Sequence, residues 1–98
     1  MIKYLEKKED FNEFIKERCL VDFYANWCGP CQMLGTVLEK IENELGVSVL
    51  KVNTDEFQEL AIKYGVMSIP TVILFENGEE IKKHIGFMKA EEIKEFIK

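Results

Sequence analysis

The sequence predicts an α/β fold in which a mixed β-sheet is flanked by helices. Apolar, β-rich segments alternate with segments whose apolar residues recur at helical spacing, a pattern typical of layered α/β proteins with parallel neighbouring strands. Two late strand-like segments are joined by Asn77-Gly78, the strongest short hairpin signal, so the sheet should also contain an antiparallel pair. The expected element order is β-α-β-α-β-α-β-β-α.

The first half of the chain predicts two strands and two helices. Residues 2–5 form a short apolar opening, and residues 11–15 carry apolar side chains at i, i+3 and i+4, which is helical spacing. The nearly continuous apolar run at residues 19–25 is typical of a strand covered on both faces. Residues 34–45 have the periodicity of a long amphipathic helix, and Gly46 suits its C-terminal cap.

The second half predicts a strand, a helix, a hairpin and a last helix. Residues 47–53 are β-rich, and Asp55 is expected to cap a helix that Gly65 closes. Residues 71–75 read as another buried strand, which the hairpin joins to residues 80–85. The last helix carries three apolar residues on one face: Ile93, Phe96 and Ile97.

Length and charge limit the function classes. A chain of 98 residues fits a single domain, expected to span residues 1–98. Its net charge is −5 with no basic stripe, which argues against nucleic-acid binding because phosphate contacts need clustered Lys or Arg. No apolar run approaches the roughly 20 residues that span a bilayer. The N-terminal residues lack a signal-peptide core, so we expect a cytoplasmic protein, in which structural disulfides are rare.

The stretch Trp-Cys-Gly-Pro-Cys at residues 27–31 has four readings: a disulfide staple, half of a metal site, a redox pair or chance. Its position between a buried strand and a helix favours the redox pair. Cys28 lies at the strand–helix junction and Cys31 in the first helical turn, where the helix dipole stabilises a thiolate. Two thiols one turn apart can close a small ring, so one attacks a disulfide and the other resolves the mixed disulfide. Pro30 suits a first turn, and Gly29 leaves room for an incoming sulfur.

Two charged residues interrupt apolar strands. Alternation places Asp22 on one face with Leu20 and Tyr24, and Lys51 lies in a neighbouring apolar strand. A buried carboxylate is costly unless it is paired or protonated. In one reading, Asp22 has a raised pKa and moves a proton to or from the resolving thiol. In the other, both residues reach solvent at strand ends or form an inert ion pair, and spacing alone leaves the two readings open.

The chain resembles the thioredoxin family over essentially its whole length. The resemblance is carried by VDFYANWCGPC at residues 21–31, KVNTD at 51–55, YGV at 64–66, SIPT at 68–71, FENG at 75–78, and Gly86. It implies a thioredoxin fold with a five-stranded mixed sheet. It also implies a general reductase of protein disulfides. Its one dithiol is oxidised to a disulfide in each reaction, and a separate reductase restores the dithiol.

Site roles follow from the same resemblance. Cys28 would be the exposed nucleophile and Cys31 the buried resolving thiol. Asp22 would be the buried acid behind the pair, with Lys51 as its supporting neighbour. Pro70 would be a cis-proline facing the disulfide. The substrate-docking surface around the first cysteine would comprise Trp27, Gly29, Pro30, Met67, Ile69, Gly86 and Phe87, with the backbone of Ile69 binding an extended substrate segment.

The sequence departs from the family pattern at a few positions near the site. Tyr24 replaces a common tryptophan. Gln32 replaces a basic residue usual after the second cysteine, which should weaken thiolate stabilisation slightly. Gly35-Thr36 stands where many relatives have a helix-kinking proline, so the helix is either straighter or bends at the glycine.

Three function classes are considered: an oxidoreductase, a zinc module and a binding module without turnover. Zinc would need Cys19, Cys28, Cys31 and His84, yet a second C-x-x-C is absent. Gly-Pro between the cysteines resembles the reducing members of the family. No nucleotide fingerprint occurs, so we expect no cofactor, and a flavoprotein or ferredoxin-linked reductase must supply electrons. The expected partners are that reductase and disulfide-containing target proteins, and the chain is expected to be a monomer.

Overall fold

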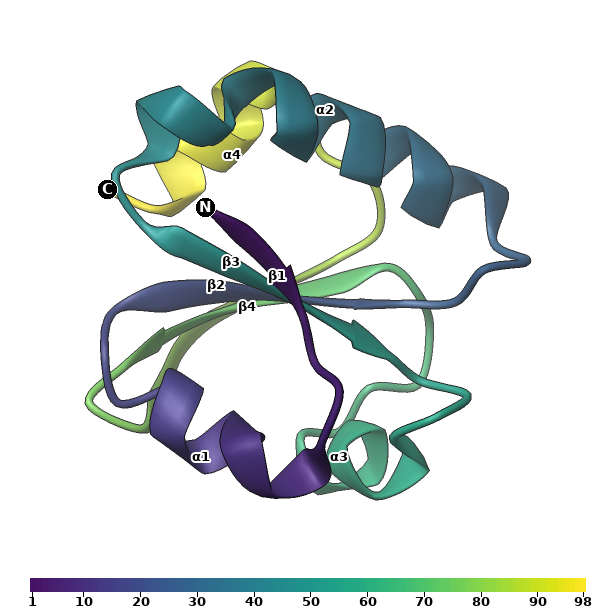
Figure 1. The fold of residues 1–98 in the computed structure, drawn as a ribbon. Helices are drawn as coiled ribbons and strands as arrows, with labels where there is room; N and C mark the ends of the chain where they lie inside the picture. The colour runs from purple at the N-terminus through teal and green to yellow at the C-terminus, as the bar shows by residue number, and fades with distance from the viewer.

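A computed structural model describes residues 1–98 and contains one mixed sheet with helices on both faces (Figure 1). The strands are β1 (Ile2–Tyr4), β2 (Cys19–Tyr24), β3 (Ser48–Asn53), β4 (Thr71–Glu76) and β5 (Glu79–Ile85). The helices are the 3₁₀ helix η1 (Lys8–Asp10), then α1 (Phe11–Phe14), α2 (Gly29–Leu45), α3 (Gln58–Lys63) and α4 (Ala90–Phe96). Helices α2 and α4 cover one face of the sheet, and α1 and α3 cover the other (Figure 1). The predicted fold class and element order are confirmed.

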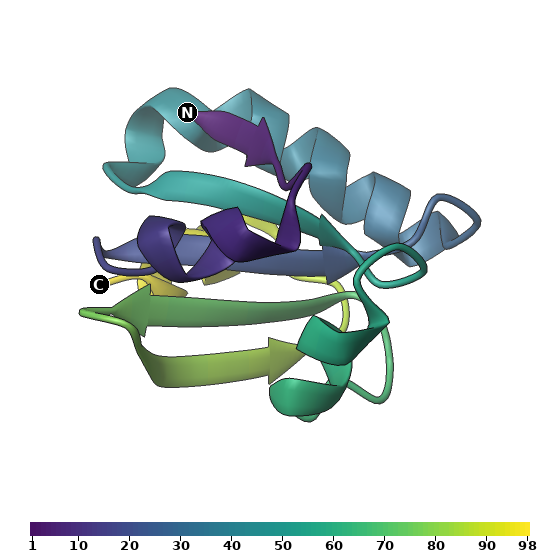
Figure 2. The same cartoon turned by 60° about the horizontal axis from the view of Figure 1, so that its bottom comes forward.

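The five strands lie in the order β1-β3-β2-β4-β5 (Figure 2). Strands β1, β3 and β2 run parallel, because helices connect them, whereas β4 is antiparallel to both β2 and β5. Asn77 and Gly78 both have positive φ, 54° and 81°, which the tight β4–β5 hairpin requires. The hairpin signal in the sequence therefore explains the mixed character of the sheet.

Alternation along the central strands divides the core between two layers. In β2, Leu20 packs on the α2 and α4 side, whereas Val21 and Phe23 pack on the α1 and α3 side. Strands β2 and β4 are buried on both faces, as their continuous apolar sequences predict. The central strands are thereby fixed in register, which positions the residues at their ends.

One row of side chains crosses the whole sheet. Tyr4 pairs with Lys51, Lys51 with Asp22, Asp22 with Val72, and Val72 with His84. Paired residues on neighbouring strands share a face, and Val72 packs in the core beneath α2 and α4. The row therefore brings the two charged residues together on the face that α2 covers.

One expected cap is wrong. Helix α3 begins at Gln58 after Phe57, so Asp55 does not cap it. The segment before α3 turns instead, with the Asp55 N–H bonded to Asn53 Oδ1 at 2.8 Å and Thr54 N–H bonded to Tyr24 O at 2.8 Å. The Asp55 carboxylate is therefore available for a contact outside this helix. None of the helices combines the length and apolar composition needed to cross a bilayer.

Candidate active site

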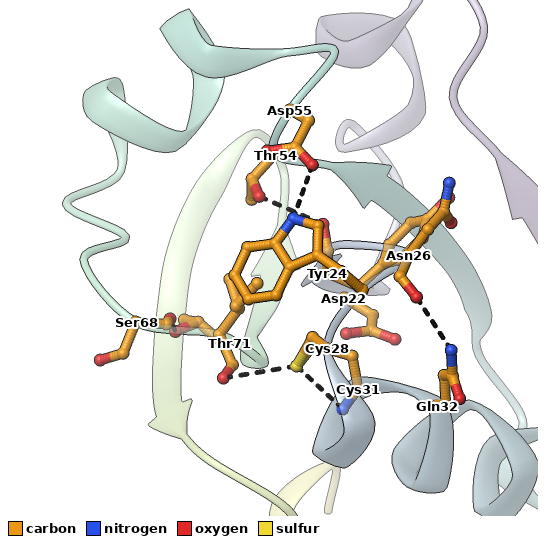
Figure 3. Close-up of a disulfide and its surroundings, with 12 residues drawn as sticks. Asp22, Tyr24, Asn26, Cys28, Cys31, Gln32, Thr54, Asp55, Ser68 and Thr71 are labelled. Carbon is orange, nitrogen blue, oxygen red and sulfur yellow. Dashed lines mark hydrogen bonds between the residues drawn. A yellow bond between two sulfur atoms is a disulfide. The ribbon is translucent and has the colours of Figure 1, made fainter.

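The two cysteines of the motif form a disulfide at the start of α2 (Figure 3). Cys28 is the N-cap of the helix and Cys31 lies in its first turn, with Cα atoms 5.2 Å apart. Pro30 occupies the first turn, where its missing N–H costs no helix hydrogen bond. The Cys31 N–H points to Cys28 Sγ at 3.2 Å, so the helix terminus stabilises negative charge on that sulfur when it is reduced.

Cys28 is more covered than the family resemblance implies. Its exposed fraction is 5%, compared with 1% for Cys31, so the expectation of an exposed nucleophile is wrong for this disulfide form. Its Sγ lies 3.8 Å from the carbonyl oxygen of Ile69, and the cysteine packs beside Ala25. The Ile69–Pro70 peptide bond is cis, and Pro70 O accepts a 2.7 Å hydrogen bond from Gly86 N–H. The segment around the cis bond therefore meets the disulfide, and it is bonded in turn to the residue that follows β5.

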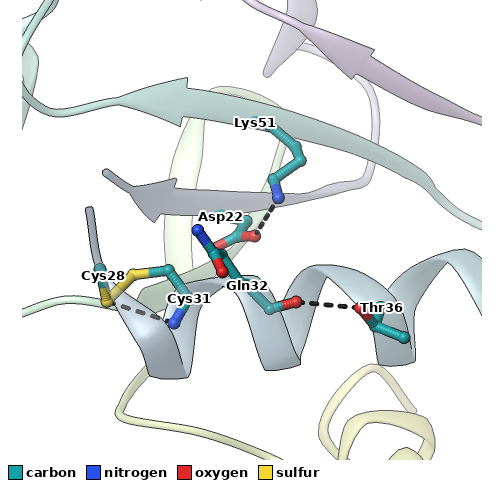
Figure 4. Close-up of polar contacts among 6 residues, drawn as sticks. All are labelled: Asp22, Cys28, Cys31, Gln32, Thr36 and Lys51. Carbon is teal, nitrogen blue, oxygen red and sulfur yellow. Dashed lines mark hydrogen bonds and ion pairs between the residues drawn. A yellow bond between two sulfur atoms is a disulfide. The ribbon is translucent and has the colours of Figure 1, made fainter. Parts of the chain in front are cut away.

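The Asp22 side chain lies behind the disulfide (Figure 4). It is fully buried, with an exposed fraction of 0%. Its Oδ2 lies 3.4 Å from Lys51 Nζ, and neither carboxylate oxygen accepts a well-formed hydrogen bond. Burial raises the pKa of Asp22 from 3.8 to about 6, although the Lys51 ammonium lowers it in part. The reading in which Asp22 reaches solvent at a strand end is therefore wrong. A carboxyl group with this pKa can exchange a proton near neutral pH.

The residues expected to form the docking surface differ in their exposure. Met67 is 96% exposed and Trp27 72% exposed, although both are apolar. The Trp27 indole N–H donates a 2.9 Å hydrogen bond to Asp55 Oδ2, which fixes this exposed side chain. The other residues comprise two exposed members, Gly29 and Pro30, and three half-buried members, Ile69, Gly86 and Phe87.

The unusual residues in the first half of α2 make local hydrogen bonds. Gln32 Nε2 donates to the carbonyl oxygen of Asn26 at 2.8 Å, which ties the helix to the loop before the motif. Thr36 Oγ1 donates to Gln32 O at 3.1 Å, and α2 continues through this point as one helix (Figure 4). Gln32 and Thr36 thus make these hydrogen bonds in the part of the helix where the family pattern has a basic residue and a proline.

The third cysteine stands apart from the pair. Cys19 is a free, buried thiol whose Sγ lies 3.8 Å from Phe14 O, and burial raises its pKa to about 11. A thiol that holds its proton so tightly is a poor nucleophile. The structure brings no group of three or more His, Cys, Asp or Glu side chains together in a metal-binding arrangement, so the four ligands of the zinc hypothesis do not meet.

Sequence reasoning missed two residues next to the site. The sequence predicts a helix cap for Asp55, and for Tyr4 only a place in the short apolar opening at residues 2–5. Asp55 in fact holds Trp27, and the Tyr4 ring centroid lies 5.7 Å from Lys51 Nζ. Both contacts join residues far apart in the chain, and no local pattern signals them.

Known proteins agree with this geometry. The sequence model of the Thioredoxin family matches residues 2–98. A thioredoxin from Mycoplasmoides gallisepticum is 37% identical over 100 residues, covering 99% of this chain and all of the relative. A Bacillus subtilis thioredoxin is 45% identical over 80 residues, covering 80% of this chain and 77% of the relative. The structure of a thioredoxin variant from Halobacterium salinarum has a TM-score of 0.91 and 36% identity, covering 98% of this chain and 87% of that one. With its C-x-x-C disulfide at a strand–helix junction, the chain belongs to the thioredoxin family of protein-disulfide oxidoreductases.

Proposed function

We propose that the chain is a general reductant of protein disulfides, built as a single domain over residues 1–98. The observation that carries the proposal is the Cys28–Cys31 disulfide, in which a helix N-terminus faces one sulfur and a buried carboxyl group lies behind the pair. Gly29 and Pro30 separate the cysteines, as in the reducing members of the family.

The reaction begins with the reduced pair. The Cys28 thiolate attacks one sulfur of a target disulfide, forming a mixed disulfide and releasing the other target sulfur as a thiolate. Cys31 then loses its proton, and its thiolate attacks Cys28 Sγ. The Cys28–Cys31 disulfide forms, and the second target sulfur leaves as a thiolate that takes up a proton. Two electrons pass to the target, which becomes a dithiol.

Asp22 serves as the proton acceptor for Cys31 in the second step. Its pKa of about 6 leaves it ionised at neutral pH, yet basic enough to accept a proton from a nearby thiol. Lys51 supports the ionised form from 3.4 Å. The reverse transfer serves the reduction of the disulfide, when Cys31 leaves as a thiolate and takes up the proton.

The target docks across the surface next to Cys28. Trp27 and Met67 supply exposed apolar area, and Gly86 and Phe87 border it from the loop after β5. When a partner covers exposed apolar groups of this kind, the burial of their surface stabilises the complex. The backbone of Ile69, beside the Cys28 sulfur, binds an extended segment of the target by strand-like hydrogen bonds.

The proposed setting is the cytoplasm, with the chain acting as a monomer between a reductase and its targets. A family member of this type receives electrons from a separate reductase, and this sequence has no nucleotide fingerprint of its own. A flavoprotein and a ferredoxin-linked enzyme both meet this need. Reduction assays with each reductase class, using purified proteins, distinguish them.

The test is the redox midpoint of the cysteine pair. The protein is equilibrated in graded thiol–disulfide buffers, and Trp27 fluorescence reports the state of the neighbouring disulfide. A midpoint of about −270 mV, the value typical of thioredoxins, supports the proposal that the chain is a general reductant. A midpoint at about −180 mV or above contradicts the proposed direction, because it is typical of disulfide isomerases. Cys19→Ser should keep the transition and Cys28→Ser should abolish it. A wild-type protein with no reversible transition would contradict redox function altogether.

A further inference from the structure

The ammonium of Lys51 lies between two tyrosine rings as well as beside Asp22. Its Nζ is 4.5 Å from the ring centroid of Tyr24 and 5.7 Å from that of Tyr4. Both distances lie within the roughly 6 Å range of cation–π attraction. The two rings meet edge to face, with centroids 6.1 Å apart. The two rings therefore form one continuous aromatic surface that contacts the ammonium.

Helix α2 approaches the same ammonium closely. A Cβ atom built on Gly35 would lie 3.0 Å from Lys51 Nζ, so only a glycine allows the helix to approach without displacing the ammonium. Lys51 is buried, and Asp22 is the only carboxylate within ion-pair distance of it. We call the surroundings formed by Tyr4, Tyr24 and Gly35 the lysine cage.

The cage borders a cleft of about 220 Å³ that also reaches Cys31. Without the cage, a lysine side chain has enough length and rotamer freedom to turn its ammonium into this cleft, where water would solvate it. An interaction must therefore keep the Lys51 ammonium beside Asp22 and out of the cleft. The two rings provide this interaction, because their negative faces attract the ammonium at the place where it also contacts the carboxylate.

We propose that Tyr24, backed by Tyr4, is a positioning residue that holds the Lys51 ammonium against Asp22 and so sets the pH range in which Asp22 takes the proton from Cys31. The proposal rests on the proposed function, in which Asp22 is the proton acceptor. It adds that the strength of this acceptor depends on two aromatic rings that contact the ammonium of its partner, Lys51.

Asp22 and Lys51 form an ion pair only with each other, and the other ionisable groups lie farther away. His84 of β5 pairs with Val72 in the same row, so it lies two strands away from Asp22. Glu56, in the turn before α3, raises the pKa of Tyr24 through its negative charge. The titratable or charged groups around the cleft come from four elements: Tyr4 of β1, Tyr24 of β2, Lys51 of β3, and Cys31 and Glu39 of α2.

The experiment measures the titration of Asp22 directly. The oxidised protein is used, because Cys28 and Cys31 cannot titrate in the disulfide, and the ¹³Cγ shift of labelled aspartate is followed against pH by NMR. Tyr24→Leu should raise the titration midpoint of Asp22 by about half a pH unit, a roughly threefold change in its ionisation constant, because the ammonium is held less firmly. Tyr24→Phe keeps the ring and should keep the midpoint. Tyr4→Leu should raise it less than Tyr24→Leu, since its ring is farther from Nζ.

A double mutant separates the cage from a general packing effect. Lys51→Met should raise the midpoint further than any ring variant, and adding Tyr24→Leu to Lys51→Met should change nothing more. If Tyr24→Leu shifts the midpoint equally with and without Lys51, the ring acts on Asp22 through burial, and the proposal is wrong. It is also wrong if Tyr24→Phe shifts the midpoint as far as Tyr24→Leu does, because the hydroxyl would then be responsible.

The pH profile of target reduction distinguishes this proposal from the proposed function. In single-turnover assays, the acidic limb for Tyr24→Leu should move up by the same amount as the NMR midpoint. An NMR shift without any change in the rate profile would contradict Asp22 as the proton acceptor while leaving the cage intact. An unchanged NMR midpoint would overturn the cage whatever the rate profile shows.

Discussion

The indole N–H of Trp27 and Oδ2 of Asp55 are 2.9 Å apart, and this bond fixes the orientation of a side chain that is 72% exposed. Asp55 follows β3, whereas Trp27 precedes α2, so the bond also joins two loops at the same edge of the sheet. A large apolar ring held in place before the target arrives loses less conformational entropy on binding.

Asp55→Ala should weaken the binding of protein targets. Loss of one hydrogen bond worth about 1 kcal/mol should lower kcat/KM for a protein disulfide about fivefold. Reduction of a small aromatic disulfide, which does not cover Trp27, should be unaffected. Asp55→Asn is the matched control, because its side-chain oxygen can still accept the bond. Equal losses in both variants would show that charge, not the hydrogen bond, is responsible.

Asp22→Asn should stabilise the oxidised protein at neutral pH. The rise in the pKa of Asp22 from 3.8 to about 6 means that the folded protein keeps a proton that the unfolded chain releases over this range. The stability contributed by protonated Asp22 is complete below about pH 4 and is lost as the pH rises through 6. Asparagine does not ionise, so the variant should gain up to about 3 kcal/mol above pH 6 and almost nothing at pH 4. Urea unfolding at both pH values checks this. An equal gain at the two pH values would contradict the raised pKa.

The same substitution should slow catalysis. In single-turnover oxidation of the reduced protein by a disulfide peptide, Asp22→Asn should lower the rate at pH 7 about 100-fold, the usual contribution of a positioned base. The wild-type rate should fall as the pH drops below about 6, where Asp22 becomes protonated. The variant should lack this dependence, and the thiol titrations that the two proteins share cancel in the ratio of their rates. A constant ratio between pH 5 and 8 would argue against Asp22 as the proton acceptor.

Gly35→Ala should raise the melting temperature of the oxidised protein. Alanine is favoured over glycine within a helix by about 1 kcal/mol. The new Cβ would meet only Lys51 Nζ, at 3.0 Å, so the gain requires the buried ammonium to shift by a few tenths of an ångström within its cage. The net gain should be about 0.5 to 1 kcal/mol, which thermal unfolding followed by circular dichroism will detect. A lower melting temperature would mean that the ammonium cannot move aside.

Met67→Ser tests the docking surface. Met67 is 96% exposed, so the substitution should change the free energy of unfolding by no more than about 0.5 kcal/mol. Its apolar area should nevertheless be covered by a bound target, so KM for a protein disulfide should rise about fivefold. Ile81→Ser is the control, because Ile81 is also exposed but lies on β5 four residues before Ile85, away from the loop at Gly86. Equal effects on KM would disprove a surface localised around Cys28.

Much of the fold and the redox pair could be predicted because their signals are local. The i, i+3, i+4 spacing, the Asn77-Gly78 turn and the residue types of the C-x-x-C motif each act within a few positions of the chain. Gly46 likewise ends α2 with a φ of 70°, a value that favours glycine.

Contacts set by strand register could not be predicted in this way. The sequence offers an Asp22–Lys51 ion pair as one reading, but the 3.4 Å contact itself depends on the alignment of β2 with β3. Asp55 was misassigned because an acidic residue before a helix normally predicts a cap, and the bond to Trp27 spans 28 positions. The low exposure of Cys28 depends on the Ile69 carbonyl, which a distant loop delivers.

Strand β1 has only three residues and forms one edge of the sheet, paired with β3 alone. Short edge strands open more readily than central ones, and local unfolding of this kind is visible in amide hydrogen exchange. Tyr4 is the last residue of this strand, so each opening removes one ring from Lys51 and admits water to the buried ion pair. We therefore expect fraying at this edge of the sheet to expose the Asp22–Lys51 pair to bulk solvent.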